Sequence, residues 1–143
     1  MNQDGKSLVE TLVALAVTGL LTVMAAPSFQ TLTSRTHVQA VTDEIASELR
    51  LARQLALAKR DRVRLVFDLE QGTISAELVN SKQTHHVYRY ADKQIVLEPP
   101  SAGREILFHP SGRSATATTI QLRGREGAVR KLTVSLTGRV AVS

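Results

Sequence analysis

The fold of this chain is decided by the segment Leu8–Ala26, LVETLVALAVTGLLTVMAA, in which Glu10 is the only charged residue. As an α-helix this segment would be roughly 28 Å long, about the thickness of the hydrocarbon core of a bilayer. A carboxylate at the centre of a membrane costs about 2.5–3.5 kcal/mol, and somewhat less near the interface. Because no basic residue lies within the segment, Glu10 needs a partner from outside it. We expect this partner to be an N-terminus newly created by cleavage, Lys6 or another protein chain.

The residues around this segment are not typical of a secretory signal peptide. The start, MNQDG, has no Lys or Arg, the apolar run is longer than a signal core, and Pro27 directly follows the Ala25-Ala26 pair that could imitate a cleavage site. A plain membrane anchor fits better but leaves Glu10 unexplained. The flanking charges, Lys6 before the span and Arg35 beyond it, are too balanced to fix an orientation.

The stretch Gly5–Leu15, GKSLVETLVAL, resembles the class III signal of type IV pilins and type II secretion pseudopilins. In that family a prepilin peptidase cleaves after the glycine and methylates the new N-terminus. The resemblance implies a leader peptide of residues 1–5, cleavage between Gly5 and Lys6, and a role in filament assembly for Glu10. It also implies a helix kink at Pro27. The sequence departs from the family in having Lys6 where Phe is usual.

The physical chemistry of Glu10 agrees with this resemblance. Cleavage would create an ammonium group near the start of the helix, and Glu10 of one subunit could neutralise the ammonium of its neighbour within an apolar bundle. A buried charge is tolerated when it is paired and hydrogen-bonded, so this pair would set the axial register between subunits. The alternative is a stray interfacial acid on a single-pass anchor.

Beyond Pro27 the apolar residues keep a helical period, with one apolar face and one face of mixed charge that we expect to be solvated. We predict one long helix from about Lys6 to about Arg60, bent near Pro27, with a membrane or filament stem at 6–27 and an amphipathic continuation at 28–60. The apolar positions of the continuation are Val38, Val41, Ile45, Leu49, Ala52 and Leu55. Its charged positions include Asp43, Glu44, Glu48, Arg50, Arg53 and Lys59.

From Arg62 the apolar period becomes two, which predicts strands. A β-hairpin is expected at 63–79 with its turn at Gln71-Gly72, and short strands are expected further on, at 85–90, 94–98, 105–108, 118–123, 131–136 and 140–142. The sequence therefore predicts an α+β fold: a long N-terminal α-helix, membrane-spanning in its first half, packed on a small antiparallel β-sheet domain at 61–143.

Three further motifs resemble the pseudopilin H (GspH)/FimT family: LRLAR at 49–53, FHPSG at 108–112 and LTVSLTGRV at 132–140. This resemblance implies a minor pilin or pseudopilin, a structural component of a type II secretion pseudopilus or a type IV pilus. Its partners would be other pilin subunits, prepilin peptidase and the bacterial inner membrane, with the globular domain on the periplasmic or extracellular side. Gly112 and Gly138 suit turns with positive φ.

The C-terminal part of the chain is basic. Residues 101–143 carry seven Lys or Arg against two acids, which indicates either an anionic partner or a solvated face. The resemblance to FimT proteins makes DNA binding in natural transformation the alternative function. Because the chain has only five aromatic residues, base stacking on single strands is poorly supported. The candidate DNA or anion ligands are Arg123, Arg125, Arg130, Lys131 and Arg139.

The sequence offers no pattern typical of an enzyme, a metal site or a cofactor site. There is no cysteine, no nucleophile elbow and no phosphate loop. On a regular strand His85 and His86 would point to opposite faces, which is poor geometry for one metal ion. We therefore expect no catalytic residue, no metal and no cofactor.

Overall fold

The computed structural model describes the backbone of residues 3–143 and the side chains of residues 7–24 and 33–143. Helix α1 runs from Gln3 to Lys59 and ends where Arg60 takes a left-handed conformation (φ 51°), which confirms the predicted helix. The chain forms two compact units, Met1–Thr33 and Ser34–Ser143. The second half of α1 belongs to the same unit as the strands.

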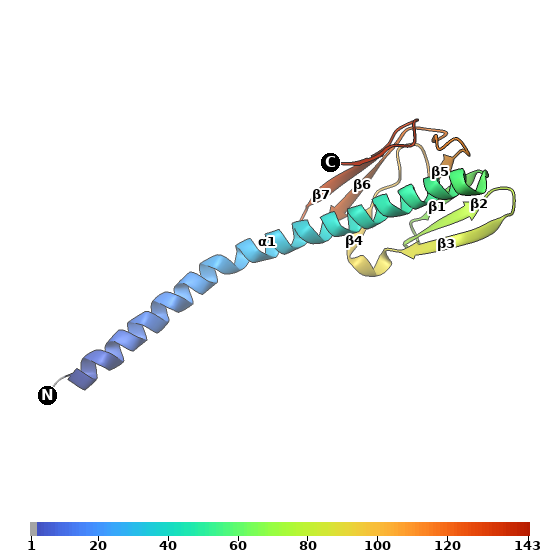
Figure 1. Ribbon diagram of the computed structural model, residues 1–143. Coiled ribbons are helices and arrows are strands. Elements are labelled where there is room, and N and C mark those ends of the chain that lie inside the picture. The colour runs from blue at the N-terminus through green and yellow to red at the C-terminus, as the bar shows by residue number, and fades with distance from the viewer. Residues whose placement is uncertain (1–2) are drawn as a thin grey trace. The chain divides into compact units, whose positions relative to one another are not determined.

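The strands form two antiparallel sheets, a division that the sequence pattern did not predict. The first sheet has the order β3-β2-β1-β5 and contains β1 (Val63–Asp68), β2 (Thr73–Leu78), β3 (Gln83–Arg89) and β5 (Glu105–Phe108). The second has the order β4-β6-β7-β8 and contains β4 (Ile95–Leu97), β6 (Thr118–Gly124), β7 (Val129–Val134) and β8 (Val140–Val142). Figure 1 labels the strands β1 to β7. The short helix η1 (Ala91–Lys93) carries the chain from the first sheet to the second, and β5 returns to pair with β1.

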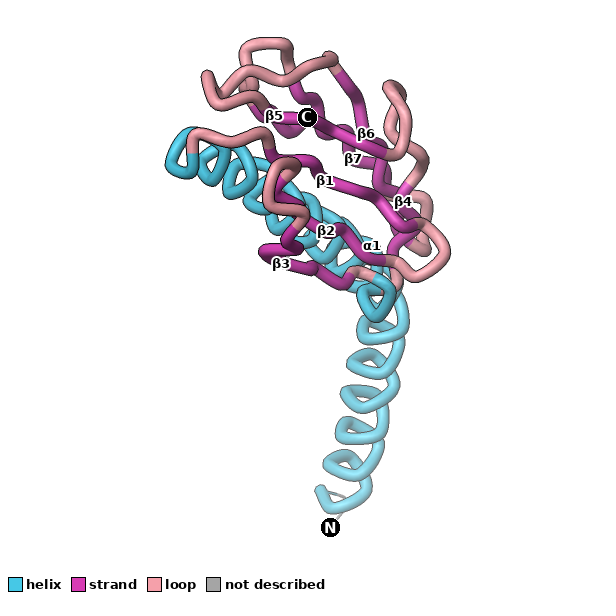
Figure 2. The backbone as a smooth tube through the Cα atoms, turned by 90° about the vertical axis from the view of Figure 1, so that its right-hand side faces the viewer, coloured by secondary structure: helices cyan, strands magenta, loops and turns pink. Residues whose placement is uncertain are grey.

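The inner faces of both sheets and the second half of α1 share one core, and Figure 2 shows the helix running behind the strands. The strands alternate between buried and partly exposed positions, as the period of two predicted. Phe67 and Phe108 are the largest side chains that are fully buried. Such burial removes apolar surface from water and is the main term that holds helix and sheets together.

The predicted apolar face of α1 is confirmed over most of its length. The five residues from Val38 to Ala52 in the predicted set are at most 2% exposed. Leu55 is only partly buried, whereas Ala56 is fully buried and continues the stripe towards the end of the helix. Thr42 also lies in the core, where its hydroxyl donates a 2.6 Å hydrogen bond to the Val38 carbonyl and is thereby satisfied.

The hairpin predicted at 63–79 is present as β1 and β2. Gly72 has a φ of 62°, and its carbonyl accepts hydrogen bonds from the amides of Tyr90 and Ala91. A Cβ atom at Gly72 would lie 2.7 Å from the Cβ of Ala91. The glycine is therefore required both by the turn and by the close approach of η1.

Candidate functional site

In the first unit, the helical segment Ser7–Met24 is long and apolar enough to cross a membrane, and none of it is buried. The hydroxyls of Thr11, Thr18 and Thr22 donate hydrogen bonds of 2.7–2.9 Å to carbonyls one turn earlier. These hydroxyls are therefore satisfied within the helix and suit an apolar surrounding. Glu10 is exposed on this helix and is the one charged residue of the segment.

Three predicted site residues lie where the structure describes no side chains. Gly5 and Lys6, the predicted cleavage and methylation residues, and Pro27, the predicted kink, fall outside the ranges 7–24 and 33–143. The backbone at each of them is helical, since α1 is continuous from Gln3 to Lys59. Their predicted roles stay predictions.

Three of the basic candidates lie on the outer side of the second sheet or in the turn beside it: Arg123, Lys131 and Arg125. Arg123 is exposed on β6, and its Nη2 lies 2.9 Å from the Glu98 carboxylate. Lys131 occupies an outward-facing position of β7, opposite Gln121. Arg125 follows β6 in the turn and donates a 3.1 Å hydrogen bond to the side-chain oxygen of Gln94.

The other two basic candidates, Arg130 and Arg139, do not lie beside these three. Arg130 alternates with Lys131 and so lies on the helix side of β7, where its guanidinium is 3.5 Å from the Gln39 oxygen of α1. Arg139 lies at the opposite end of the strands, in the turn between β7 and β8, beside a shallow depression that Thr119 and Thr133 help to line. The structure therefore does not bring the five cations together on one face.

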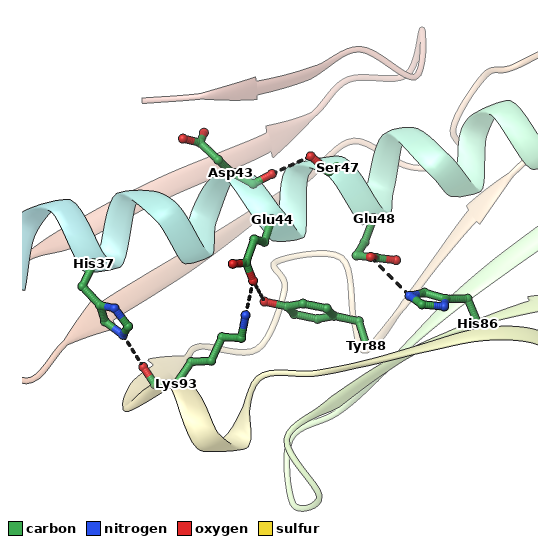
Figure 3. Close-up of polar contacts among 8 residues, drawn as sticks. All are labelled: His37, Asp43, Glu44, Ser47, Glu48, His86, Tyr88 and Lys93. Carbon is green, nitrogen blue, oxygen red and sulfur yellow. Dashed lines mark hydrogen bonds and ion pairs between the residues drawn. The ribbon is translucent and has the colours of Figure 1, made fainter.

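Two acids of the charged face of α1 are paired with the first sheet and η1 (Figure 3). Glu44 stays exposed, as predicted, whereas Glu48 is only partly exposed. The Glu44 carboxylate accepts a 2.6 Å hydrogen bond from the Tyr88 hydroxyl and pairs with the Lys93 ammonium. Hydrogen bonds from Lys93 and then from Tyr88 lower the pKa of Glu44. Burial, and next the Glu44 carboxylate, raise the pKa of Tyr88. His37 adds a 2.8 Å contact with the Lys93 carbonyl.

The histidine pair of β3 lies at a β-bulge. His86 pairs with Ala76 and Thr84 pairs with Glu77, so His85 is an extra residue without a partner in the register, and the strand is not regular there. The imidazole of His86 lies 3.3 Å from the Glu48 carboxylate. Among the described residues, no group of three or more His, Asp or Glu side chains is placed to hold a metal ion.

Three of the motifs singled out in the sequence meet at one point. Nε of Arg53 in α1 donates a 2.9 Å hydrogen bond to the Gly112 carbonyl in the segment after β5. A Cβ atom at Gly138, in the β7–β8 turn, would lie only 2.0 Å from that same carbonyl oxygen and 3.0 Å from Arg53 Nε. Gly112 and Gly138 have φ values of 77° and 76°, as predicted. We name this contact the Arg53 junction.

The Arg53 junction could not be located from the sequence, because its three members are far apart in the chain. The available signal was that LRLAR, FHPSG and LTVSLTGRV each resemble motifs of the same family. A second close approach lies at the other end of the unit, where a Cβ at the buried Gly124 would be 2.4 Å from Cγ2 of Val38. Glycine at these sites lets the turns pack directly against α1.

An exposed apolar helix that continues into a helix packed on antiparallel sheets is the arrangement of type IV pilin-like proteins. Residues 41–138 match the family model described as type II transport protein GspH. The chain therefore belongs to the GspH family, which confirms the predicted resemblance. No curated protein sequence matches the chain significantly.

Solved structures of a minor pilin and of a minor pseudopilin share this fold. The type IV minor pilin FimU of Pseudomonas aeruginosa (strain PAO1) superposes with a TM-score of 0.66 at 17% identity, over 78% of this chain and 92% of that chain. The minor pseudopilin EpsH from the type 2 secretion system of Vibrio cholerae superposes with a TM-score of 0.62 at 11% identity, over 75% and 96% of the two chains. At these identities the likeness shows the fold.

Proposed function

We propose that this protein is a minor pilin or pseudopilin, a structural subunit of a type II secretion pseudopilus or a type IV pilus. The observation that carries the proposal is the exposed apolar helix Ser7–Met24, with a single carboxylate at Glu10, attached to a domain of the GspH family. Exposed apolar surface of this length requires a membrane or other helices to cover it. A filament subunit is covered first by the membrane and then, after assembly, by the helices of its neighbours. The family and its structural relatives are pilins rather than enzymes, and we propose no catalytic role.

The proposed course begins in the inner membrane, which the helix spans once, with the globular domain on the periplasmic or extracellular side. Prepilin peptidase cleaves between Gly5 and Lys6 and methylates the new N-terminus. Glu10 then pairs with the ammonium group of a neighbouring subunit, because an apolar bundle tolerates a charge only when it is partnered. This pair fixes the axial position of one subunit against the next.

The variant Glu10→Ala tests this role. We expect it to insert into the membrane as the wild type does, since removing a charge lowers the cost of insertion. We expect it to be absent from sheared filaments, as measured by immunoblotting of membrane and filament fractions. Thr11→Ala, which removes a hydroxyl satisfied within its own helix, is the matched control and should assemble. Normal assembly of Glu10→Ala would refute the proposed pairing.

Processing has a separate test. Mass spectrometry of the mature chain should show a protein that begins at a methylated Lys6. Replacing Gly5 with a bulky residue should block cleavage and leave the full-length precursor in the membrane. A mature chain that begins elsewhere would contradict the proposed site.

The alternative function, a DNA-binding pilin used in natural transformation, has less support. Arg123 is paired with Glu98, Arg130 is directed to α1, and Arg139 lies at the far end of the strands. If DNA is nevertheless bound through phosphate contacts, gel shifts of the full chain in detergent should weaken steeply with salt. Binding at low salt that is lost on replacing Arg125, Arg130 and Arg139 with Ala would favour this alternative.

A further inference from the structure

The unit Ser34–Ser143 has two ends, and the end at which α1 stops gathers four separate segments. The amide of Val79, beside the β2–β3 turn, donates a 2.9 Å hydrogen bond to the Arg62 carbonyl just before β1. The Gly112 segment and the β7–β8 turn meet at the Arg53 junction. We call this end, which includes residues 53–62, 79–82, 109–114 and 135–139, the basic end.

The basic end carries a strong excess of positive charge. Its acid is Asp61, whose carboxylate accepts the Arg62 amide at 2.6 Å. The nearby acid Glu77 lies within β2, opposite Arg64 of β1. Among the described residues, no carboxylate lies within ion-pair distance of the basic side chains of this end. These basic residues are Arg53, Lys59, Arg60, Arg62, Lys82, Arg113 and Arg139.

The opposite end of the unit is mixed in charge. The hydrogen bonds of Gly72 with η1, and of Arg125 with Gln94, bring together the β1–β2 turn, η1 and the β6–β7 turn. This end therefore offers no acidic face that would complement the basic end of a second copy. Its acids are Asp68, Glu70, Asp92 and Glu126, and its basic residues include Arg89, Arg104 and Arg125.

The basic end also exposes two leucines. Leu57 is 45% exposed and Leu136 is 49% exposed. Both lie by the segment after β5: a Cβ at Gly112 would lie 3.3 Å from Cδ2 of Leu57, and the Leu136 carbonyl accepts the Ser114 amide at 3.1 Å. Exposed apolar side chains at a surface that also carries arginines are typical of a protein interface.

A protein partner suits this surface better than a single-stranded nucleic acid. Arginine is enriched at protein interfaces, and apolar anchors fit pockets of a partner protein. Single-stranded nucleic acid is usually held by exposed aromatic rings. The aromatic side chains that the structure describes are buried or half-buried, and none of them offers an exposed stacking face at this end. They are Phe67, Tyr88, Tyr90 and Phe108.

We propose that the basic end is the surface by which this protein docks onto an acidic, apolar-lined face of a different subunit of the same filament. The proposal rests on the proposed function as a filament subunit. Charge complementarity would orient the two subunits and suppress wrong partners, while Leu57 and Leu136 would supply the buried apolar contact.

The test uses the full chain in cells that assemble the filament. A photo-cross-linking amino acid is placed at Leu57 or at Leu136, and in a control at Val96, which is 65% exposed on the outer face of the second sheet. The expected product joins Leu57 or Leu136 to an acidic segment of another pilin-type subunit, identified by mass spectrometry. The Val96 probe should not give this product.

Charge reversal then separates the two ends. The pair Arg113→Glu and Arg139→Glu should lower the yield of that product about tenfold or more, because like charges would face each other across the interface. The matched pair Arg89→Glu and Arg104→Glu makes the same change in net charge at the opposite end and should leave the yield unchanged. The pair Arg113→Gln and Arg139→Gln removes both charges without reversing them. Unfolding curves of all variants show whether each one is folded.

Different results would overturn the docking surface and the role as a filament subunit. Cross-links from Leu57 and Leu136 that go to DNA, or that persist in the Arg113 and Arg139 variants, would overturn the docking proposal. Cross-links from a probe at Leu12, on the apolar helix, to filament subunits would then leave the filament role intact. If no probe, including that at Leu12, reaches a filament subunit, the proposed function itself fails.

Discussion

Arg53 Nε donates a 2.9 Å hydrogen bond to the Gly112 carbonyl, and that carbonyl oxygen also lies against the backbone of Gly138. The contact ties α1 to the segment after β5 of the first sheet and to the β7–β8 turn of the second. The guanidinium is partly buried, so the bond has more weight than a surface ion pair. It holds together the end of the domain that we propose as a docking surface.

Replacing Arg53 with Ala should destabilise the protein by about 1.5–3 kcal/mol, since it removes a charged donor and leaves the Gly112 carbonyl without this partner. Urea unfolding measures the loss. Arg50→Ala, on the exposed side of the same helix, should cost much less. Arg53→Lys keeps the charge but not the planar Nε donor and should recover only part of the stability. Full recovery by Lys would contradict the geometric account.

Gly138→Ala should be far more damaging than Gly127→Ala. Both glycines have positive φ, 76° and 79°, so both substitutions cost about 1–2 kcal/mol in backbone strain. The Cβ at Gly127 meets nothing within 4 Å, whereas that at Gly138 would lie 2.0 Å from the Gly112 oxygen. Thermal unfolding of the two variants measures the difference. Equal losses would show that the packing at the Arg53 junction is unimportant.

Gly124→Ala should be rescued in part by shortening Val38. The new Cβ would lie 2.4 Å from Cγ2 of Val38, a methyl group that Val38→Ala removes. Each single substitution should destabilise, and the double variant should be more stable than the sum predicts by about 0.5–3 kcal/mol. A double-mutant cycle of unfolding free energies checks this. Additive losses would mean that the two residues do not compete for space.

Glu44→Gln should cost stability at neutral pH and cost less in acid. Lys93 and Tyr88 lower the folded-state pKa of Glu44 below its ordinary value of 4.5. The stabilisation is therefore fully present above about pH 4.5 and is lost as the pH falls through the lower, folded-state pKa. Unfolding free energies of wild type and variant should converge in that range. In a Tyr88→Phe background the difference in unfolding free energy that Glu44→Gln causes should be smaller. A difference that grows in acid would contradict the lowered pKa of Glu44.

Much of the architecture follows from local patterning. The apolar period of α1 and the alternation of β1 and β2 are set by residues that are neighbours in the chain, so both could be predicted. The left-handed turns at Gly112 and Gly138 could also be predicted, because glycine is the residue that adopts positive φ without strain. Family membership followed from motifs of the same local kind.

The division into two sheets could not be predicted, since strand pairing depends on contacts between distant residues rather than on alternation. The pairing of β5 with β1 and the bulge at His85 are of this kind. The pairing of Glu44 and Glu48 could not be predicted for the same reason: the charged face of a helix shows its own period, but not the edge strand that comes to lie beside it.

By itself, the sequence determined the helix, the strands, the turns and the isolated carboxylate at Glu10, because each depends on residues close together in the chain. Only the tertiary structure decided which charges face each other. It separated Arg139 from Arg123 and brought Arg139 to the same end of the domain as Arg53 and Arg113. The physical reason is that electrostatic surfaces are formed by distance in space, which the packing of α1 against two sheets sets.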